Sequence, residues 1–459
     1  MPELEQDLTD FLHALNGRVD GEVKSDYMSR ILYSTDASMY QIMPHGVLIP
    51  RTVDDVQAAV EEAAKHNVPI LPRGGGSSLA GQAVGAALII DLTRWLDQIV
   101  SFDPEQGQVV VQSGIVLDRL NAYLQSSGWM VGPDPASSNR ATIGGMVGNN
   151  ATGTHSILYG SVVDHVESIR TVMADGSIAN LGPVDQDTWF GKAARADLFN
   201  AEARIIRELD LLLADGADII RRDTPRHWRR AGGYRLERLL AEEGEGRREE
   251  GAGPSVNLAH LLCGSEGTLG IAGEITLNLV RRPKQTALGI VHFSSRMEAL
   301  EAVPVILETN PSAIELFDRH GIDQCRRSPG FSHRLGFVEG DPDALLLTEY
   351  YGESDAELSA NLDELTRLSL QQHVGYTVVP LFEPADIANV WDLRKGALGL
   401  ILGVKGDFKP VAFIEDAAVP PEHLAEYIGQ LERVLTETGT DAAMYAHASA
   451  GCLHVRPFI

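Results

Sequence analysis

Three glycine-rich segments interrupt the apolar runs of this 459-residue chain, and they constrain its fold more than any other feature. They read PRGGGSSLAGQAVG (72–85), GPDPASSNRATIGGMVGNNATGTHSILYG (132–160) and CGSEGTLGI (263–271). Consecutive glycines let the backbone approach a ligand closely, and successive N–H groups in such a loop can bind an anion such as pyrophosphate. The second segment is also too long for a plain connection. A flexible turn would explain the first segment alone, but the three together indicate one extended ligand that contains phosphate.

The first segment does not match two familiar phosphate-binding motifs. It leads into more glycine and then a strand, whereas a G-x-G-x-x-G dinucleotide motif leads into a helix. It also lacks the G-K-[ST] of a P-loop. The ligand-binding domain is therefore predicted to be neither a Rossmann domain nor a P-loop domain.

Apolar runs and helix signals around these segments predict alternating strands and helices. A capping box at Thr52 and Asp55 starts a helix between strands at 46–50 and 68–72, which makes a β-α-β unit. Further predicted elements are strands at 86–92, 107–114 and 273–280, a helix at 116–129, and a hairpin that turns at Asp175-Gly176. Residues 186–254 read as a charged helical insertion with a mobile loop at 241–254, and Pro283 marks a domain boundary.

The composition limits the classes of partner. A net charge of −26 disfavours nucleic acid and anionic membrane surfaces, so an anionic ligand must be held by local Arg, Lys or backbone N–H groups. No apolar run approaches the ~20 residues of a membrane span, although peripheral attachment to the inner face of a membrane stays open. Three scattered cysteines, Cys263, Cys325 and Cys452, form neither a disulfide framework nor a CxxC site. We therefore expect a cytoplasmic protein.

The segments RGGGSSLAG, PDPASSNRATIGGMVGNNATG and GSEGTLGI make the chain resemble a known family over residues 30–459. Their order and spacing are similar to those in the FAD-linked oxidases of the vanillyl-alcohol-oxidase or p-cresol-methylhydroxylase (PCMH) type. That family includes D-lactate dehydrogenases, the glycolate oxidase flavin subunit and D-2-hydroxyglutarate dehydrogenases. The resemblance implies an α+β fold with an N-terminal helical segment (1–44), a PCMH-type two-subdomain FAD-binding domain (45–283) and an α+β substrate (cap) domain (284–459).

The resemblance also implies which residues bind FAD. The first loop would wrap the pyrophosphate, the second would line the ribityl chain and isoalloxazine, and the third would close over the adenosine or the flavin edge. His155 is the nearest candidate for a covalent flavin anchor. The implied cofactor-binding residues are Arg73, Gly74, Gly75, Gly76, Ser77, Ser78, Asp134, Ser137, Thr142, Gly144, Gly145, Asn149, Gly153, Glu266, Gly267 and Ile271.

Oxidation of a 2-hydroxy acid needs a cation for the carboxylate and a group that takes the hydroxyl proton. Arg394 lies in VWDLRKGALG, which reads as a helix, and a solvated ion pair would explain it on sequence alone. By resemblance it matches a W-x-L-R helix whose Arg binds the substrate carboxylate. Leu398 departs from the Thr of hydroxyglutarate-type members, and Lys409 matches a second anchor poorly.

His447 and His454 form the ends of HASAGCLH, which resembles the family signature H-x-G-D-G-N-x-H. Both histidines and Gly451 are kept, while Ala450 and Cys452 replace Asp and Asn. The resemblance implies that the two histidines bind a divalent metal, Zn or Mn; the alternative is that they contact substrate and flavin directly. Arg456 stands where hydroxyglutarate-type members have Asn, and could bind a carboxylate.

The HASAGCLHVRP form resembles a long bacterial branch in which an iron–sulfur domain follows. The family's further metal ligand and catalytic His, in an E-H-G segment, have no counterpart here. We therefore expect a fragment of a longer protein, with any 4Fe-4S cluster in a missing C-terminal domain and a third metal ligand beyond residue 459.

The function that follows is FAD-dependent oxidation of a D-2-hydroxy acid, such as D-lactate or D-2-hydroxyglutarate, to the 2-keto acid. Electrons would pass to a quinone, a cytochrome or an iron–sulfur acceptor. Two alternatives stay open: an oxidase of another alcohol on the same flavin scaffold, and a non-catalytic FAD-binding subunit or inactive fragment.

Overall fold

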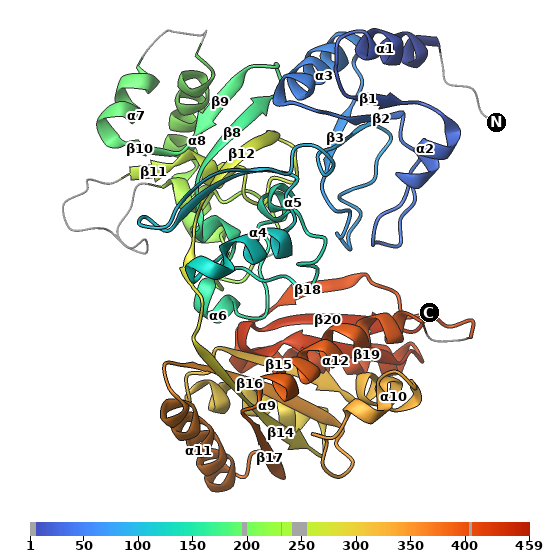
Figure 1. Ribbon diagram of the computed structural model, residues 1–459, viewed down its shortest axis with the longest axis vertical. Coiled ribbons are helices and arrows are strands. Elements are labelled where there is room, and N and C mark those ends of the chain that lie inside the picture. Colours follow the sequence, from blue (N-terminus) through green and yellow to red (C-terminus); the bar gives the residue numbers. More distant parts are fainter. Residues whose placement is uncertain (1–5, 195–199, 231, 241–254, 404–405) are drawn as a thin grey trace. The chain divides into compact units, whose positions relative to one another are not determined.

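The computed structural model describes residues 6–194, 200–230, 232–240, 255–403 and 406–459 (Figure 1). The chain divides into two compact units. The first comprises residues 1–151, 161–226 and 231–281, and the second comprises residues 152–160, 227–230 and 282–459. The division between Arg281 and Arg282 lies two residues from the boundary predicted at Pro283.

The first unit begins with a small mixed sheet and three helices. The sheet order is β1-β2-β4-β3, in which β2, β4 and β3 are parallel and β1 is antiparallel. The predicted capping box is present at the start of α3, and Asn67 ends that helix in the left-handed conformation. This confirms the β-α-β unit. The elements are α1 (Gln6–Asn16), β1 (Glu22–Lys24), α2 (Tyr27–Leu32), β2 (Gly46–Ile49), α3 (Val53–His66), β3 (Ile70–Arg73) and β4 (Leu88–Asp91).

The expected helical segment 1–44 contains β1 as well as two helices. Because β1 pairs with β2 and α1 packs its buried Phe11 and Leu15 against the α3 core, this segment belongs to the mixed sheet layer. It is not a separate helical appendage.

The second part of the first unit is an antiparallel sheet of order β5-β6-β12-β8-β9. The predicted hairpin is present, since β8 pairs with β9 and Gly176 turns with φ +80°. Its strands are β5 (Ile99–Asp103), β6 (Gln108–Gln112), β8 (Val166–Met173), β9 (Ile178–Leu181) and β12 (Gly270–Asn278). The surrounding elements are α4 (Leu117–Leu124), α5 (Ile143–Asn149), α7 (Gln186–Ala193), α8 (Ala201–Asp223), and the strand pairs β7–β13 (Trp129–Met130, Val280–Arg281) and β10–β11 (Pro183–Asp185, Ser255–Asn257). The loop predicted at 241–254 lies outside the described residues.

The second unit is built on a seven-stranded antiparallel sheet of order β17-β14-β16-β15-β19-β20-β18, the yellow-to-red part of Figure 1. Its strands are β14 (Gln285–Phe293), β15 (Ala313–Asp318), β16 (Ala344–Gly352), β17 (Thr377–Leu381), β18 (Ile414–Ala418), β19 (Ala442–His447) and β20 (Cys452–Pro457). Its helices are α6 (Ser156–Tyr159), α9 (Arg296–Leu307), α10 (Arg319–Arg327), α11 (Asp355–Gln372), α12 (Pro384–Leu402) and α13 (Leu424–Glu437).

Two apolar cores cover this sheet, one on each face. Side chains of α9, α11 and α13 join alternate strand residues in the larger core, whereas α10 and α12 cover the opposite face. Period-two alternation along the strands therefore turns successive side chains to opposite faces of the sheet. The face under α12 also carries the polar residues described below.

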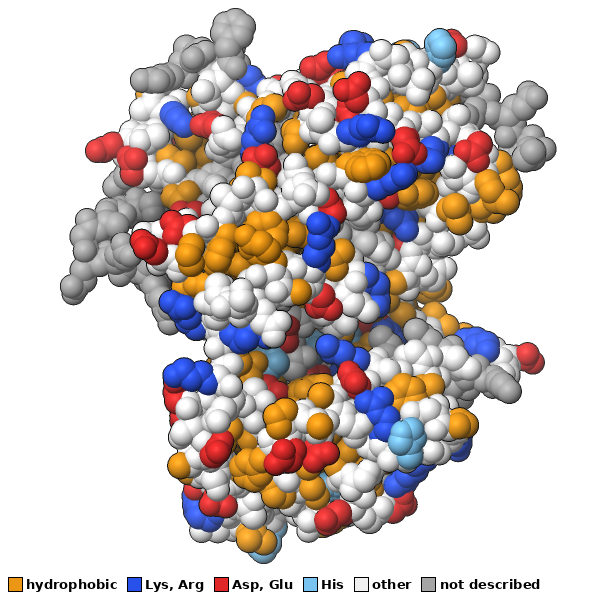
Figure 2. Space-filling view, viewed as in Figure 1, with side chains coloured by type: hydrophobic (Ala, Val, Ile, Leu, Met, Phe, Trp, Pro, Cys, Tyr) orange, Lys and Arg blue, Asp and Glu red, His pale blue; other side chains and the backbone are white. Residues whose placement is uncertain are grey.

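The described helices include none that is long and apolar enough to cross a membrane. Figure 2 shows acidic and basic side chains interspersed over the visible face.

Candidate functional site

The three glycine-rich loops converge within the first unit. Asn149, at the end of α5, donates from Nδ2 to Ser78 Oγ at 3.1 Å, which joins the second loop to the first. The third loop lies against both, since Glu266 N donates to Gly148 O at 3.0 Å and an ideal Cβ on Gly267 would lie 2.5 Å from Pro72 Cγ. The three distant segments therefore lie together in the first unit, as a shared site requires.

The first loop presents unpaired backbone donors. Within the described chain, no backbone N–H of residues 74–79 donates a hydrogen bond to another residue. Gly76 has φ +62°, which turns the backbone there, and a Cβ on Gly75 would lie 2.1 Å from Arg140 O. A run of N–H groups without partners is costly unless water or an anion accepts from them. The loop therefore has the donors that a pyrophosphate requires.

Arg73 contacts the loops that surround the first glycine-rich loop. Its guanidinium donates to the carbonyls of Ala83 at 2.9 Å, Thr35 at 2.9 Å and Tyr33 at 3.3 Å, and it also stacks on the Tyr33 ring. These contacts brace the neighbouring loops. The guanidinium also lies against the first loop (residues 74–79, here called the anion loop), since an ideal Cβ on Gly76 would lie 2.7 Å from Arg73 Nη2. A role of Arg73 at the pyrophosphate stays a prediction.

The other predicted cofactor residues divide into two groups. Thr142 caps α5 by accepting from Gly145 N at 3.2 Å, and Gly144 is packed against Ser113 so closely that a Cβ would lie 2.6 Å from Ser113 Cβ. Ile271 is 5% exposed, and its side chain packs in the apolar core under α3. The remaining residues lie in loops: Asp134 and Ser137 in the first unit, and Gly153, whose N–H donates to Ser156 Oγ, in the segment that groups with the second unit.

A cluster of polar and charged residues, most of them buried, lies on the face of the seven-stranded sheet that α12 covers. Their neighbours along each strand point to the opposite apolar core, so alternation turns the polar residues to this face. The cluster comprises Glu315 on β15, Arg394 on α12, Glu415 on β18, Tyr445 and His447 on β19, and His454 and Arg456 on β20.

Glu315 connects two of the predicted catalytic residues. One carboxylate oxygen accepts from Arg394 Nη2 at 2.8 Å, and the other contacts His447 Nδ1 at 2.6 Å. Burial of Glu315 opposes its ionisation, but the hydrogen bond from His447 and the charge of Arg394 outweigh burial and hold the pKa of this carboxyl below its usual range. Arg394 is 9% exposed, so the solvated-helix interpretation is wrong. Its Nε is buried with no hydrogen-bond partner among the described residues.

His454 has an equivalent arrangement with Glu415. Its Nδ1 contacts Glu415 Oε2 at 2.8 Å, and the Tyr445 ring stacks on the imidazole with centroids 4.6 Å apart. Burial lowers the pKa of His454 to about 4, and burial likewise lowers the pKa of His447. Both imidazoles are therefore neutral near pH 7.

Both histidines leave the same atom available. An ionised carboxylate only accepts hydrogen bonds, so Nδ1 carries the proton in each ring and Nε2 holds the lone pair. The two rings meet edge to face with centroids 5.2 Å apart. This arrangement suits a metal ligand or a general base, because in both cases a carboxylate orients the imidazole through its other nitrogen.

Arg456 is fully buried and already has partners. Its Nη2 donates to Tyr445 Oη at 2.6 Å, and its guanidinium forms an ion pair with Glu415. Burial lowers its pKa to about 10. The side chain supports Tyr445 and Glu415 from within the sheet, while its Nε is buried with no hydrogen-bond partner among the described residues. A role of Arg456 at a substrate carboxylate stays a prediction.

Sequence reasoning missed Glu315, Glu415 and Tyr445. A signal existed for Glu315, because an acidic residue in the buried strand AIELFD must have a partner. Lys409 is exposed, and its backbone pairs with that of Ile459. His155 contacts Glu349 Oε2 at 2.5 Å and stacks on Tyr351, all within the second unit.

Comparisons with known proteins agree with this geometry. Residues 44–182 match the FAD binding domain family, and residues 282–459 match the C-terminal domain of FAD-linked oxidases. Among solved structures, p-cresol methylhydroxylase shares the fold with a TM-score of 0.65 at 14% identity, over 99% of this chain and 84% of that chain.

Sequence relatives give the same result. The chain is 32% identical to a D-2-hydroxyglutarate dehydrogenase of Pantoea ananatis over 99% of its own length and 45% of that protein. It is 25% identical to a glycolate oxidase subunit of Bacillus subtilis over 93% of this chain and 75% of that one. A mitochondrial D-lactate dehydrogenase (cytochrome) of Kluyveromyces lactis is 24% identical over 90% of this chain and 60% of that protein.

The first of these relatives is much longer than this sequence, which spans 45% of its length. The resemblance drawn from the glycine-rich segments and the paired histidines is confirmed, as is the α+β fold with a PCMH-type FAD-binding domain. This chain belongs to the FAD-linked oxidases, with an FAD binding domain followed by the C-terminal domain of that family.

Proposed function

We propose that the protein is an FAD-dependent dehydrogenase that oxidises a D-2-hydroxy acid, such as D-2-hydroxyglutarate or D-lactate, to the 2-keto acid. The observation that carries this proposal is the buried set of Arg394, Glu315 and His447, which combines a cation with an oriented neutral imidazole. The names of the sequence relatives support the same reaction class.

The first unit fits FAD on its own geometry. The unpaired N–H groups of residues 74–79 would hold the pyrophosphate, while Ser78 and Asn149, already hydrogen-bonded to each other, offer hydroxyl and amide groups beside it. When bound, FAD supplies the acceptor for the hydrogen and two electrons that leave the substrate carbon.

The residues of the second unit act on the acid. Arg394 binds the substrate carboxylate through the donors that Glu315 leaves available. The Nε2 lone pair of His447 or His454 accepts the hydroxyl proton, and the carboxylate at Nδ1 stabilises the imidazolium that forms. Burial of both rings excludes water from the proton transfer.

The divalent ion, Zn or Mn, that the family resemblance implies at the Nε2 atoms of His447 and His454 stays a prediction, and the proposed reaction does not depend on His447 as a ligand. Both rings are held by carboxylates at Nδ1, as ligand histidines usually are. Such an ion would orient the substrate hydroxyl and lower its pKa.

The electron acceptor is proposed from the family alone: a quinone, a cytochrome or an iron–sulfur domain. Since the chain spans 45% of its hydroxyglutarate dehydrogenase relative, a 4Fe-4S cluster would be held by sequence outside these residues. We place the reaction in the cytoplasm, where a peripheral position at a membrane would bring a quinone within reach. The three described cysteines are all free and buried, in keeping with a reducing compartment.

The test is turnover by the purified full-length protein with an artificial electron acceptor. D-2-hydroxyglutarate, D-lactate and glycolate are compared with the L enantiomers and with the simple alcohols that correspond to them. We expect activity with one or more D-2-hydroxy acids and none with alcohols that lack the carboxylate. Turnover of alcohols and acids alike would reassign the protein as an oxidase of other alcohols, and bound FAD without any turnover would favour a non-catalytic flavin subunit.

A further inference from the structure

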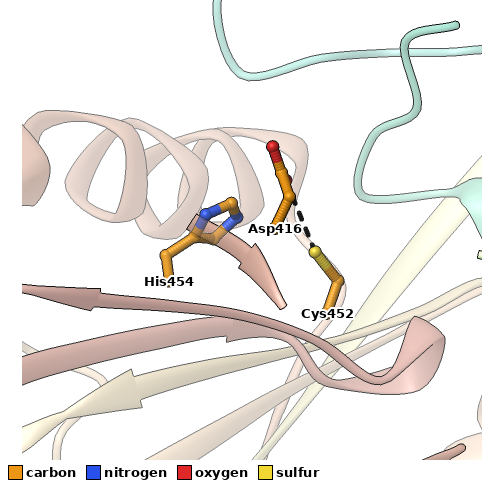
Figure 3. A group of neighbouring side chains, drawn as sticks. All are labelled: Asp416, Cys452 and His454. Atoms are coloured by element: carbon orange, nitrogen blue, oxygen red, sulfur yellow. Dashed lines mark hydrogen bonds between the residues drawn. The ribbon is translucent and has the colours of Figure 1, made fainter. Parts of the chain in front are cut away.

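Asp416, Cys452 and His454 bring three different ligand atoms together at one end of the sheet (Figure 3). One carboxylate oxygen, the thiol sulfur and one imidazole nitrogen all lie within 4.8 Å of one another. The Cys452 thiol donates to Asp416 Oδ1 at 3.6 Å, the contact drawn as a dashed line. His447 is not a member of this set.

The backbone explains why two consecutive acidic residues reach the same place. Neighbouring strand residues normally point to opposite faces, but the pairing of β18 with β20 shifts register between Ile414 and Ala417. Asp416 lies in that irregularity with φ +50°, a conformation that a non-glycine residue seldom adopts. The bulge lets Glu415 contact His454 Nδ1 while Asp416 approaches Cys452.

A second backbone feature fixes Cys452. Gly451 has φ +66°, and a Cβ there would lie 1.7 Å from Val419 O, so only glycine fits this turn. Cys452 therefore begins β20 at a set position, opposite Ala418 of β18. Its place facing Asp416 follows from two local constraints rather than from a flexible loop.

A nearby cation balances the two acidic ligands. Arg229, 6% exposed, donates from Nη2 to Cys452 Sγ at 3.2 Å and lies 3.5 Å from Asp416 Oδ1. Burial raises the pKa of the Cys452 thiol to about 12, so an ion that binds here must displace the thiol proton, and the N–H to sulfur contact from Arg229 stabilises the thiolate that forms. The Asp416 side chain is 45% exposed, which gives an ion access to the site.

The mixture of donors selects among ions. A ligand set of one thiolate sulfur, one imidazole nitrogen and one carboxylate oxygen suits Zn²⁺, whereas Mn²⁺ and Mg²⁺ favour oxygen ligands. Glu415 supplies the outer-shell carboxylate that orients His454 and keeps Nε2 for the metal. Three protein ligands and one open position are typical of a catalytic rather than a structural zinc site.

We propose that Asp416, Cys452 and His454 form a Zn²⁺ site of this chain, with the fourth position open to a substrate hydroxyl. The cysteine replaces the Asn of the family signature, so this ligand set differs from the histidine pair expected from the sequence. The use of the ion rests on the proposed function, but its binding can be measured without turnover. A protein that binds zinc here without oxidising hydroxy acids would contradict the proposed function and still support the zinc site.

The first test is zinc analysis and X-ray absorption at the zinc edge on the full-length, FAD-loaded protein. We expect about one zinc per chain and a sulfur neighbour at about 2.3 Å, distinct from nitrogen and oxygen neighbours at about 2.0–2.2 Å. Protein that holds no zinc after equilibration with the ion, or zinc with only nitrogen and oxygen neighbours, would overturn the proposal. The absorption edge does not overlap the flavin spectrum, so the wild type alone gives the answer.

The second test compares matched variants. Cys452→Ser should weaken zinc binding by at least about 10–100-fold and remove the sulfur signal, since a ligand is lost. Cys325→Ser changes another buried cysteine, on α10, and should leave the zinc affinity and the sulfur signal unchanged. His454→Gln should lose the ion, while His447→Gln should keep the sulfur signal; loss in His447→Gln with retention in Cys452→Ser would contradict the proposed ligand set. Thermal melting of each variant confirms that it is folded.

Discussion

Arg394 is the residue on which substrate binding depends in this account. Its guanidinium and Glu315 form a buried ion pair, and Nε has no partner among the described residues. Buried ion pairs contribute little net stability, but loss of one partner leaves the other charge uncompensated. The pair therefore has separable roles in stability and in binding, and two substitutions can distinguish them.

Arg394→Gln should lower kcat/KM for a D-2-hydroxy acid by about 2–4 kcal/mol, or roughly 30- to 1,000-fold, because a charge-assisted contact to the carboxylate is lost. FAD content should not change. The exposed neighbour Lys395→Gln is the matched control and should behave as wild type.

Arg394→Gln should also lower the melting temperature, because the Glu315 carboxylate is left buried without its cation. The double variant Arg394→Gln, Glu315→Gln should recover much of that thermal stability, since no unpaired carboxylate remains, but it should not recover activity. If Arg394→Gln keeps wild-type kcat/KM, the carboxylate role assigned to this residue is wrong.

The free energy of unfolding of the first unit depends on pH through His260. Burial, followed by the charge of Arg238, lowers its pKa to about 4, and its Nδ1 is buried without a partner among the described residues. The unfolded chain binds a proton near pH 6.5, whereas the folded chain does not until about pH 4. The unfolded state therefore holds more protons in this window, and the free energy of unfolding falls as the pH falls.

We expect the wild type to lose roughly 1–2 kcal/mol through His260 between about pH 7 and pH 5, and His260→Gln to lose correspondingly less. Urea unfolding at the two pH values measures this. Equal losses in the two proteins would show that His260 is not kept neutral by folding.

At the scale of elements, the anion loop depends on glycine. A side chain at Gly75 would collide with the Arg140 carbonyl and push the first loop away from the second. Gly75→Val should abolish FAD binding, as flavin absorbance after gel filtration will show. Gly191→Val, in α7 with nothing within 4 Å of its Cβ, should keep the flavin. Retention of flavin by Gly75→Val would place the cofactor elsewhere.

The turn before β20 makes a second prediction. Gly451 and Gly439 share a left-handed backbone, with φ of +66° and +67°, but only Gly451 lacks room for a Cβ. Gly439→Ala should cost about 1–2 kcal/mol, the strain of that conformation for alanine. Gly451→Ala should cost more, because Val419 must also move. Comparable costs in denaturant unfolding would show that the turn can relax.

Local elements could be predicted from the sequence, and their long-range partners could not. The capping box at Thr52, the hairpin at Gly176 and the anion loop rest on neighbouring residues, and all three are present. Glu315 and His447, however, meet only because β15 and β19 are paired in a set register. The bulge at Asp416 likewise depends on how β18 pairs with β20. No pattern within either strand specifies these partners.

At the scale of the whole molecule, the two units divide the chemistry. The first has the nucleotide-binding loops, and the second has the buried acids, arginines and histidines. The expectation of a third metal ligand beyond residue 459 has an alternative within the chain, since Asp416 and Cys452 accompany His454. In the proposed scheme, FAD passes its electrons to an acceptor that lies outside these residues.

Reduction of the bound flavin by substrate in the absence of oxygen tests the central claim most directly, because it needs no external acceptor. FAD-loaded full-length protein is mixed with D-2-hydroxyglutarate or D-lactate, and the flavin absorbance is followed. We predict complete bleaching by at least one D acid, none by its L enantiomer, and reduction in Arg394→Gln slowed by roughly 100-fold. Flavin that stays oxidised with every D-2-hydroxy acid would contradict the account.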